Sequence, residues 1–263
     1  MRLLALDFDG VISDSASESF VVALRTYLAF LPGSSLMGDA SDLMGTSAPL
    51  LERVHGAPAY APFLQMMPLG NRAEDYAVVL AAIDAGLTIA DQPGYDRFRA
   101  EQDPAWLSEF HRRFYAERKG LSGADPEGWR RLMAPYAPIV DLLRRRAVDA
   151  VLAIATSKDR RSVEALLRLY GIEDLFPADR ILDKETGPSK RLHLEVLARR
   201  FDVDFPGITF VDDKVNHLDR VAPLGTRCGL AAWGYNGDRE IALARKRGYL
   251  VCTLAEAERQ LFG

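Results

Sequence analysis

The stretch that decides the fold is Leu3-Leu4-Ala5-Leu6-Asp7-Phe8-Asp9-Gly10-Val11. Its apolar run predicts a short buried strand, and two carboxylates two positions apart follow that strand directly. Side chains alternate along a strand, so Asp7 and Asp9 point the same way if the strand continues through them. Gly10 then permits a tight turn. Two like charges at one strand end repel each other. We therefore expect a divalent metal there, a nucleophile with an acid/base partner, or both.

The same short motif is also common in ordinary acidic turns, so the rest of the chain has to decide between the two interpretations. After residue 135, strand-like and helical segments alternate. This alternation predicts a parallel sheet covered by helices. The predicted strands span residues 150–155, 207–211, 229–233 and 249–251.

The segment between the first strand and residue 135 has a different character. Apolar residues recur at helical spacing over 15–31, 74–85 and 106–119, and several prolines interrupt the pattern. No segment in this region shows a strand pattern. The sequence therefore predicts an α/β core made of residues 1–14 and 136–263, divided by an all-helical insertion over residues 15–135.

Composition excludes several classes of partner. The 263 residues include 48% hydrophobic and 27% charged residues, with a formal net charge of −4, which is ordinary for a globular protein and lacks a nucleic-acid footprint. No apolar run approaches the roughly 20 residues of a membrane span. Cys228 and Cys252 have no metal-ligand spacing, which fits a reducing compartment. The chain enters its first strand at once, without a signal peptide, so we expect a cytoplasmic protein. No signal indicates a particular oligomeric state.

Polar residues follow three of the predicted strands, and a lysine begins a helix between the second and third of them. In a parallel sheet all carboxyl ends lie at one edge, so these groups can converge there. Four spaced elements that fit one site are far more specific than any one of them. The set comprises Asp7, Asp9, Thr156, Ser157, Lys190, Asp212 and Asp213.

With these motifs the chain resembles the haloacid dehalogenase superfamily of phosphotransferases. The matching segments are Asp7-Phe8-Asp9-Gly10-Val11, Ala155-Thr156-Ser157-Lys158, Lys190 and Phe210-Val211-Asp212-Asp213. The resemblance implies a Rossmann-like parallel sheet with helices on both faces, and a helical cap inserted after the first motif. The segment Trp233-Gly234-Tyr235 is similar to a run in members that resemble phosphoglycolate phosphatases.

The resemblance also implies roles for the four acids. Asp7 is the nucleophile that forms an aspartyl-phosphate, and Asp9 is the general acid and base. Mg²⁺ is held by Asp7, the backbone carbonyl of Asp9 and the carboxylate of Asp213. Asp212 supports the ion directly or through water. Which of Asp212 and Asp213 is the direct ligand stays open at this point.

The remaining motif residues are assigned to the phosphoryl group. Thr156 hydrogen-bonds a phosphoryl oxygen, although it could instead cap the following helix and leave that role to Ser157. Lys190 neutralises charge on Asp7 and the phosphate, in competition with Lys184 and Lys158. We favour Lys190 because Ser189 has the character of a helix N-cap, which would direct Lys190 towards the strand ends.

In the insertion, Arg72 is a candidate contact for a phosphorylated substrate, although an arginine on a solvated helix face is the commoner situation. One position departs from the family pattern. Members often carry another acid about four residues after the last metal aspartate, where this chain has Asn216 and His217. His217 is either a supporting partner of the metal site or a surface residue, and we favour the surface.

The predicted function is that of a Mg²⁺-dependent phosphatase acting on a small phosphorylated metabolite. Asp9 favours the phosphatase and phosphomutase branch, because dehalogenases of the superfamily do not need an acid two residues after the nucleophile. A phosphomutase using the same aspartyl-phosphate chemistry is the first alternative. A non-catalytic binding member of the family is the second.

Overall fold

The computed structural model describes residues 2–70, 72–187 and 189–263. The chain forms two compact units, one of Met1–Asp14 with Pro135–Gly263 and one of Ser15–Ala134. They are called the core unit and the helical unit below. The two connections between them, β2 (Ser13–Asp14) and β3 (Ala134–Pro135), pair as a small two-stranded sheet.

The core unit is built on one parallel sheet with the strand order β5-β4-β1-β6-β7-β8. Counted along the chain within this sheet, the order is 3-2-1-4-5-6, the doubly wound arrangement in which ligands bind where the order reverses. That reversal lies between β1 and β6. The strands are β1 (Leu3–Leu6), β4 (Val151–Ala155), β5 (Ile181–Leu182), β6 (Ile208–Asp212), β7 (Arg227–Ala231) and β8 (Leu250–Cys252).

Helices cover the sheet and begin and end where the sequence provides signals. In α10, Asp159 caps the start by accepting from the Ser162 amide at 2.9 Å, and Gly171 ends the helix at a φ of +64°. The helices of the core unit are α9 (Ala137–Arg146), α10 (Arg160–Tyr170), α11 (Lys190–Phe201), α12 (Val215–Val221), α13 (Asp238–Lys246) and α14 (Ala257–Phe262). Short 3₁₀ helices add Glu173–Leu175, Ala178–Arg180, Phe205–Gly207 and Ala222–Leu224.

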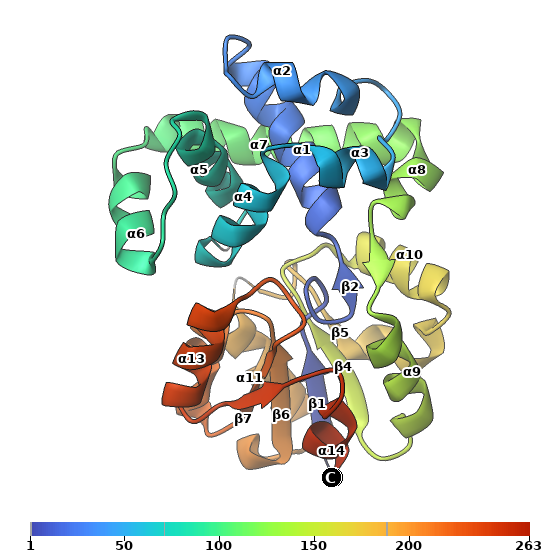
Figure 1. Cartoon of the computed structure of the whole chain (residues 1–263). Helices are drawn as coiled ribbons and strands as arrows, with labels where there is room; N and C mark the ends of the chain where they lie inside the picture. Colours follow the sequence, from blue (N-terminus) through green and yellow to red (C-terminus); the bar gives the residue numbers. More distant parts are fainter. Residues whose placement is uncertain (1, 71, 188) are drawn as a thin grey trace. The chain divides into compact units, whose positions relative to one another are not determined.

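The strands bury both of their faces. Leu3, Ala5 and Phe210 pack on one face with residues of α11, α12 and α13. Because side chains alternate, Leu4 and Leu6 bury the opposite face, and Figure 1 shows helices on both sides of the sheet. The predicted Rossmann-like α/β fold is therefore confirmed. The sequence pattern does not predict β5, which at two residues is too short to show a periodicity.

The helical unit contains no strand pattern within residues 16–70 and 72–133. Its interior holds a chain of edge-on and tilted rings that runs through Tyr60, Phe20, Phe63, Tyr76 and Phe114. Such ring pairs add specific geometry to the burial of apolar area. The helices are α1 (Ala16–Phe30), α2 (Met37–Ala40), α3 (Leu51–Gly56), α4 (Tyr60–Met66), α5 (Ala73–Asp84), α6 (Gln92–Ala100), α7 (Pro104–Ala124) and α8 (Pro126–Arg131), with 3₁₀ turns at Ser41–Leu43 and Met67–Leu69.

Across the described part of the chain, no helix combines the length and the apolar character needed to cross a membrane.

Candidate functional site

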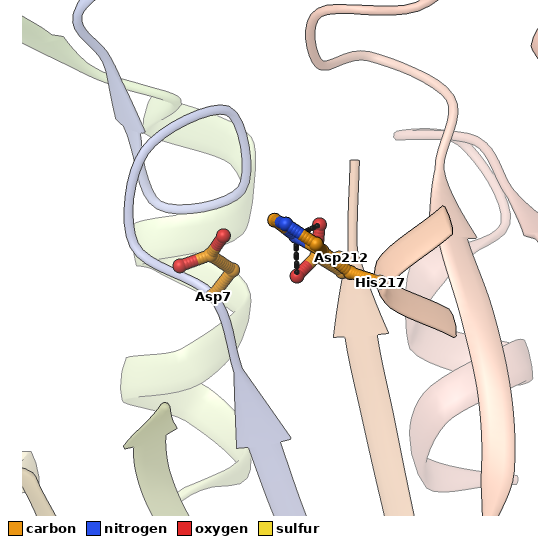
Figure 2. A group of neighbouring side chains, drawn as sticks. All are labelled: Asp7, Asp212 and His217. Atoms are coloured by element: carbon orange, nitrogen blue, oxygen red, sulfur yellow. Dashed lines mark hydrogen bonds and ion pairs between the residues drawn. The ribbon is translucent and has the colours of Figure 1, made fainter. Parts of the chain in front are cut away.

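The site lies at the carboxyl edge of the core sheet, where the strand order reverses. Asp7 follows β1 directly, and Asp212 is the last residue of β6. The backbone amide of Asp7 donates to the carbonyl of Val211 at 2.9 Å, so the pairing of the two strands sets their ends side by side. Figure 2 shows the side chain of Asp7 near those of Asp212 and His217, with dashed lines from His217 to both carboxylate oxygens of Asp212.

A tight loop after Asp7 brings Gly10 against Asp213. The carbonyl of Phe8 accepts from the amides of Ile12 and Ser13, both at 2.9 Å. Gly10 lies in the left-handed region at a φ of +79°, and a Cβ there would lie 2.5 Å from the carboxyl carbon of Asp213. Glycine is thus required twice, for its backbone conformation and for the close approach of a carboxylate.

Lys190 joins two acids of the edge. Its Nζ lies 2.7 Å from Oδ1 of Asp7 and 3.5 Å from Oδ2 of Asp212, and it donates to the carbonyl of Ala155 at 2.6 Å. Ser189 caps α11 by accepting from the amide of Leu192, which places Lys190 at the first helical position. Burial lowers the pKa of Lys190, but the attraction of Asp7 and Asp212 outweighs it, so the net direction is upwards.

Of the competing lysines, Lys184 is partly exposed beside Glu185 and Lys158 is paired with Asp9. Nζ of Lys184 lies 3.9 Å from Glu185, and its side chain is 42% exposed. Nζ of Lys158 donates to both carboxylate oxygens of Asp9, at 3.1 and 3.3 Å, and its side chain is almost fully buried. Lys190 is therefore the lysine next to Asp7, and Lys158 is next to Asp9. Each lysine holds a different acid of the first motif, which spacing alone cannot show.

The two hydroxyl residues after β4 differ in burial. Thr156 is buried, and its Oγ1 accepts from the amide of Lys158 at 3.2 Å. Ser157 is exposed. Thr156 therefore shapes the turn that carries Lys158, and both hydroxyls lie at the end of the strand next to β1.

His217 is mostly buried and contacts Asp212, so the expectation of a surface position is wrong. Its side chain is only 12% exposed, and its Nδ1 lies 3.1 and 3.0 Å from the two carboxylate oxygens of Asp212. Burial alone would raise the pKa of Asp212, but His217 and Lys190 together hold it well below its usual range. The sequence offers both a supporting and a surface position for His217, and spacing cannot decide between them, because the contact with Asp212 depends on how α12 packs against β6.

Asp213 occupies the other side of this strand end. It is 1% exposed, and its Oδ2 accepts from the amide of Tyr235 at 3.0 Å. Burial and the repulsion of Asp212 raise its pKa well above the usual range. The segment Trp233–Tyr235 forms the wall here, since the indole of Trp233 donates to the carbonyl of Val11 at 3.1 Å.

The residues present fit a divalent cation. Asp7, Asp212 and Asp213 are all buried, and Lys190 is the buried cationic side chain that contacts Asp7 and Asp212, while the imidazole of His217 contacts Asp212. Burial also raises the pKa of Asp7, against the attraction of Lys190. Donor atoms of Asp7, Asp212 and His217 lie within 4.8 Å of one another. Carboxylate oxygens suit Mg²⁺, and an added positive charge would relieve the repulsion among them.

Arg72, the predicted substrate contact in the insertion, belongs to the helical unit. It is the N-cap residue of α5, its side chain is 67% exposed, and its Nη1 lies 3.9 Å from Glu74.

Comparison with known proteins tests the resemblance. A family profile described as haloacid dehalogenase-like hydrolase matches residues 1–219. This chain belongs to that family. None of the curated proteins matches the chain.

Two solved structures of similar fold illustrate the family. A predicted phosphoglycolate phosphatase from Haemophilus somnus aligns with a TM-score of 0.65 at 18% identity, covering 99% of this chain and 98% of that one. A hydrolase of the haloacid dehalogenase-like family from Streptococcus pneumoniae aligns with a TM-score of 0.62 at 14% identity, covering 99% and 98%. At these identities the likeness establishes the fold, and the haloacid dehalogenase-like site has to be interpreted from its own residues.

Proposed function

We propose that this hydrolase is a Mg²⁺-dependent phosphatase that acts on a small phosphorylated metabolite through an aspartyl-phosphate on Asp7. One observation carries the proposal: the two acids of the first motif each have their own buried lysine. Lys190 contacts Asp7 at 2.7 Å, and Lys158 contacts Asp9 at 3.1 Å. The arrangement keeps two carboxylates at one strand end distinct in environment, as a nucleophile and an acid/base pair require.

Asp7 is the attacking group in this proposal. Its carboxylate is nearly buried at the strand end, so little water competes for it. Lys190 favours the ionised, nucleophilic form and offsets the charge that builds up when a phosphoryl group approaches. Attack forms the bond from a carboxylate oxygen of Asp7 to phosphorus, and the bond from phosphorus to the ester oxygen breaks.

Asp9 handles the proton. Its side chain is 32% exposed, so unlike Asp7 it remains accessible to a leaving group and to water. In the first step Asp9 gives a proton to the departing ester oxygen, and in the second it takes one from the water that hydrolyses the aspartyl-phosphate. Lys158 holds the carboxylate in one orientation between these steps.

The remaining residues complete the site. Asp7, Asp212 and Asp213 with the carbonyl of Asp9 would hold Mg²⁺, which when bound neutralises charge on the phosphoryl oxygens. His217 orients Asp212 through Nδ1. The hydroxyl of Thr156 or of Ser157 would donate to a phosphoryl oxygen. Phosphoryl transfer depends mostly on such positioning and charge stabilisation.

The test is release of inorganic phosphate from a panel of phosphorylated metabolites, with Mg²⁺ and with a chelator. We expect Asp7→Asn to lower the rate by about 10⁴-fold or more, the scale of about 5 kcal/mol in the barrier, because the amide cannot attack. Asp141→Asn, which changes an exposed carboxylate of α9, is the matched control. Release that continues in Asp7→Asn would contradict the assignment of the nucleophile. Accumulation of an isomer without inorganic phosphate would indicate a mutase.

A further inference from the structure

A cavity in the helical unit is not used by the chemistry above. It has a volume of about 440 Å³, is open to solvent, and is lined by the start of α5, the end of α6 and the first half of α7. These helices lie together in Figure 1. A volume of this size suits a small metabolite. All of its described lining residues come from this one unit.

The acids of this cavity are already matched by partners. Glu74 is mostly buried, and its Oε2 lies 2.7 Å from Nδ1 of His111. Next to it, Asp75 accepts from Nε of Arg99 and from the hydroxyl of Tyr95, both at 2.9 Å. A cation entering the cavity would therefore have to displace these contacts.

The donors of the cavity are largely uncommitted. Arg99 uses Nε for Asp75, and among the described residues the structure gives its two Nη groups no acceptor. Within the described part of the chain, the one acid paired with the guanidinium of Arg72 is Glu74, at 3.9 Å. Ser108 and His111 also line the space, and none of the described residues accepts from the Ser108 hydroxyl or from Nε2 of His111. Two arginines, a histidine and a serine thus line one cavity.

We propose that this cavity is a binding site for a small carboxylate or phosphate anion. Arg72 and Arg99 supply the planar donor pairs that match either group, and Ser108 and His111 add single hydrogen bonds. Leu107 and Pro104 give the wall an apolar part for a short carbon skeleton. The site is independent of the proposed phosphatase chemistry, because it uses none of the residues at the sheet edge.

The test is isothermal titration calorimetry with inorganic phosphate and, separately, with malonate, at constant ionic strength and with a chelator present. We expect Arg72→Gln to weaken binding at least tenfold, because a charge-assisted contact is lost. Ser108→Trp fills the cavity without changing charge and should abolish binding. Arg112→Gln is the matched control, since Arg112 lies on the same unit with the same 67% exposure but outside the cavity. Arg72→Lys should recover part of the affinity.

Hydrogen exchange locates the ligand during the same titration. We expect protection over residues 97–111, which contain most of the cavity wall. Binding of phosphate alone or malonate alone identifies the preferred anion and supports the site. The proposal is overturned if neither anion binds, if Arg72→Gln and Ser108→Trp leave binding unchanged, or if protection appears only in the core unit. Such a result leaves the phosphatase assay unaffected, because it involves no turnover.

Discussion

The two units bury carboxylates in opposite ways. In the helical unit, Glu18 is fully buried and completely matched: Arg118 donates to both of its oxygens at 2.7 Å, and the indole of Trp129 donates at 3.1 Å. At the sheet edge of the core unit, Asp7 and Asp212 share Lys190, and Asp213 has a backbone amide.

The difference separates an acid that serves the fold from acids that serve a site. A buried charge is costly unless it is paired and hydrogen-bonded, and the Glu18 cluster meets that condition within the protein. The acids at the sheet edge are only partly paired within the protein. The negative charge that remains there can bind a cation and take part in phosphoryl transfer. The carboxyl edge of the sheet is therefore distinguished by buried charge without a full set of partners, and less by the number of acids.

The largest expected effect on stability tests the matched cluster. Glu18→Gln leaves the guanidinium of Arg118, which is only 15% exposed, without its counter-charge. Breaking a buried pair in this way costs about 3–5 kcal/mol in the free energy of unfolding, measured by urea titration. Glu109→Gln is the control, because Glu109 also binds two arginines but does so at the surface, where we expect little change. Equal effects in the two variants would remove the distinction that the comparison draws.

A pH effect is expected in the core unit. Burial, with Lys190 nearby, lowers the pKa of His193 from 6.5 to about 4, and none of the described residues is a hydrogen-bond partner of its buried Nδ1. Between pH 6.5 and 4, the imidazole of His193 is therefore protonated in the unfolded chain but not in the folded chain. Stability is fully present above pH 6.5 and decreases as the pH falls towards 4, by about 3 kcal/mol. Urea titrations across this range measure the loss, which His193→Gln should remove. A pH dependence that persists in His193→Gln would assign the loss to another group.

The smallest effect is expected for a substitution of Asp213 at the sheet edge of the core unit. Asp213→Asn removes one of the repelling carboxylates, and its amide oxygen still accepts from the backbone of Tyr235. Because repulsion and burial raise the pKa of Asp213, we expect the variant to be more stable in a chelator. The rise in melting temperature that Mg²⁺ produces in the wild type should disappear. A destabilised variant would show that Asp213 is matched after all.

Much of the core unit could be predicted because its signals are local. A buried parallel strand needs a short apolar run, and the runs ending at Leu6, Ala155 and Val211 supply it. The polar residues after those runs then lie at one edge of the sheet by geometry alone. Helix starts were predictable for the same reason, as with Ser189 before α11, because a cap acts within four residues.

The contacts that spacing could not predict join residues far apart in the chain. Lys158 and Asp9 are 149 positions apart, and Glu18 and Arg118 are 100 apart. His217 is only five positions from Asp212, yet its burial depends on how α12 packs against β6. The cavity between α5, α6 and α7 likewise follows from packing, and no motif marks it.

The sequence by itself determined the longer strands of the core, the alternation of strands and helices, the acids at the strand ends and the lysine at the start of α11. Each of these depends on residues within about one turn or one strand. Tertiary structure alone decided which lysine holds which acid, that His217 supports Asp212, and that Glu18 is matched while the sheet edge is not. The physical reason is that the balance of charge at a buried site depends on which charged groups lie close together in space. These groups come from segments that are far apart in the chain, so only the folded structure shows which of them are neighbours.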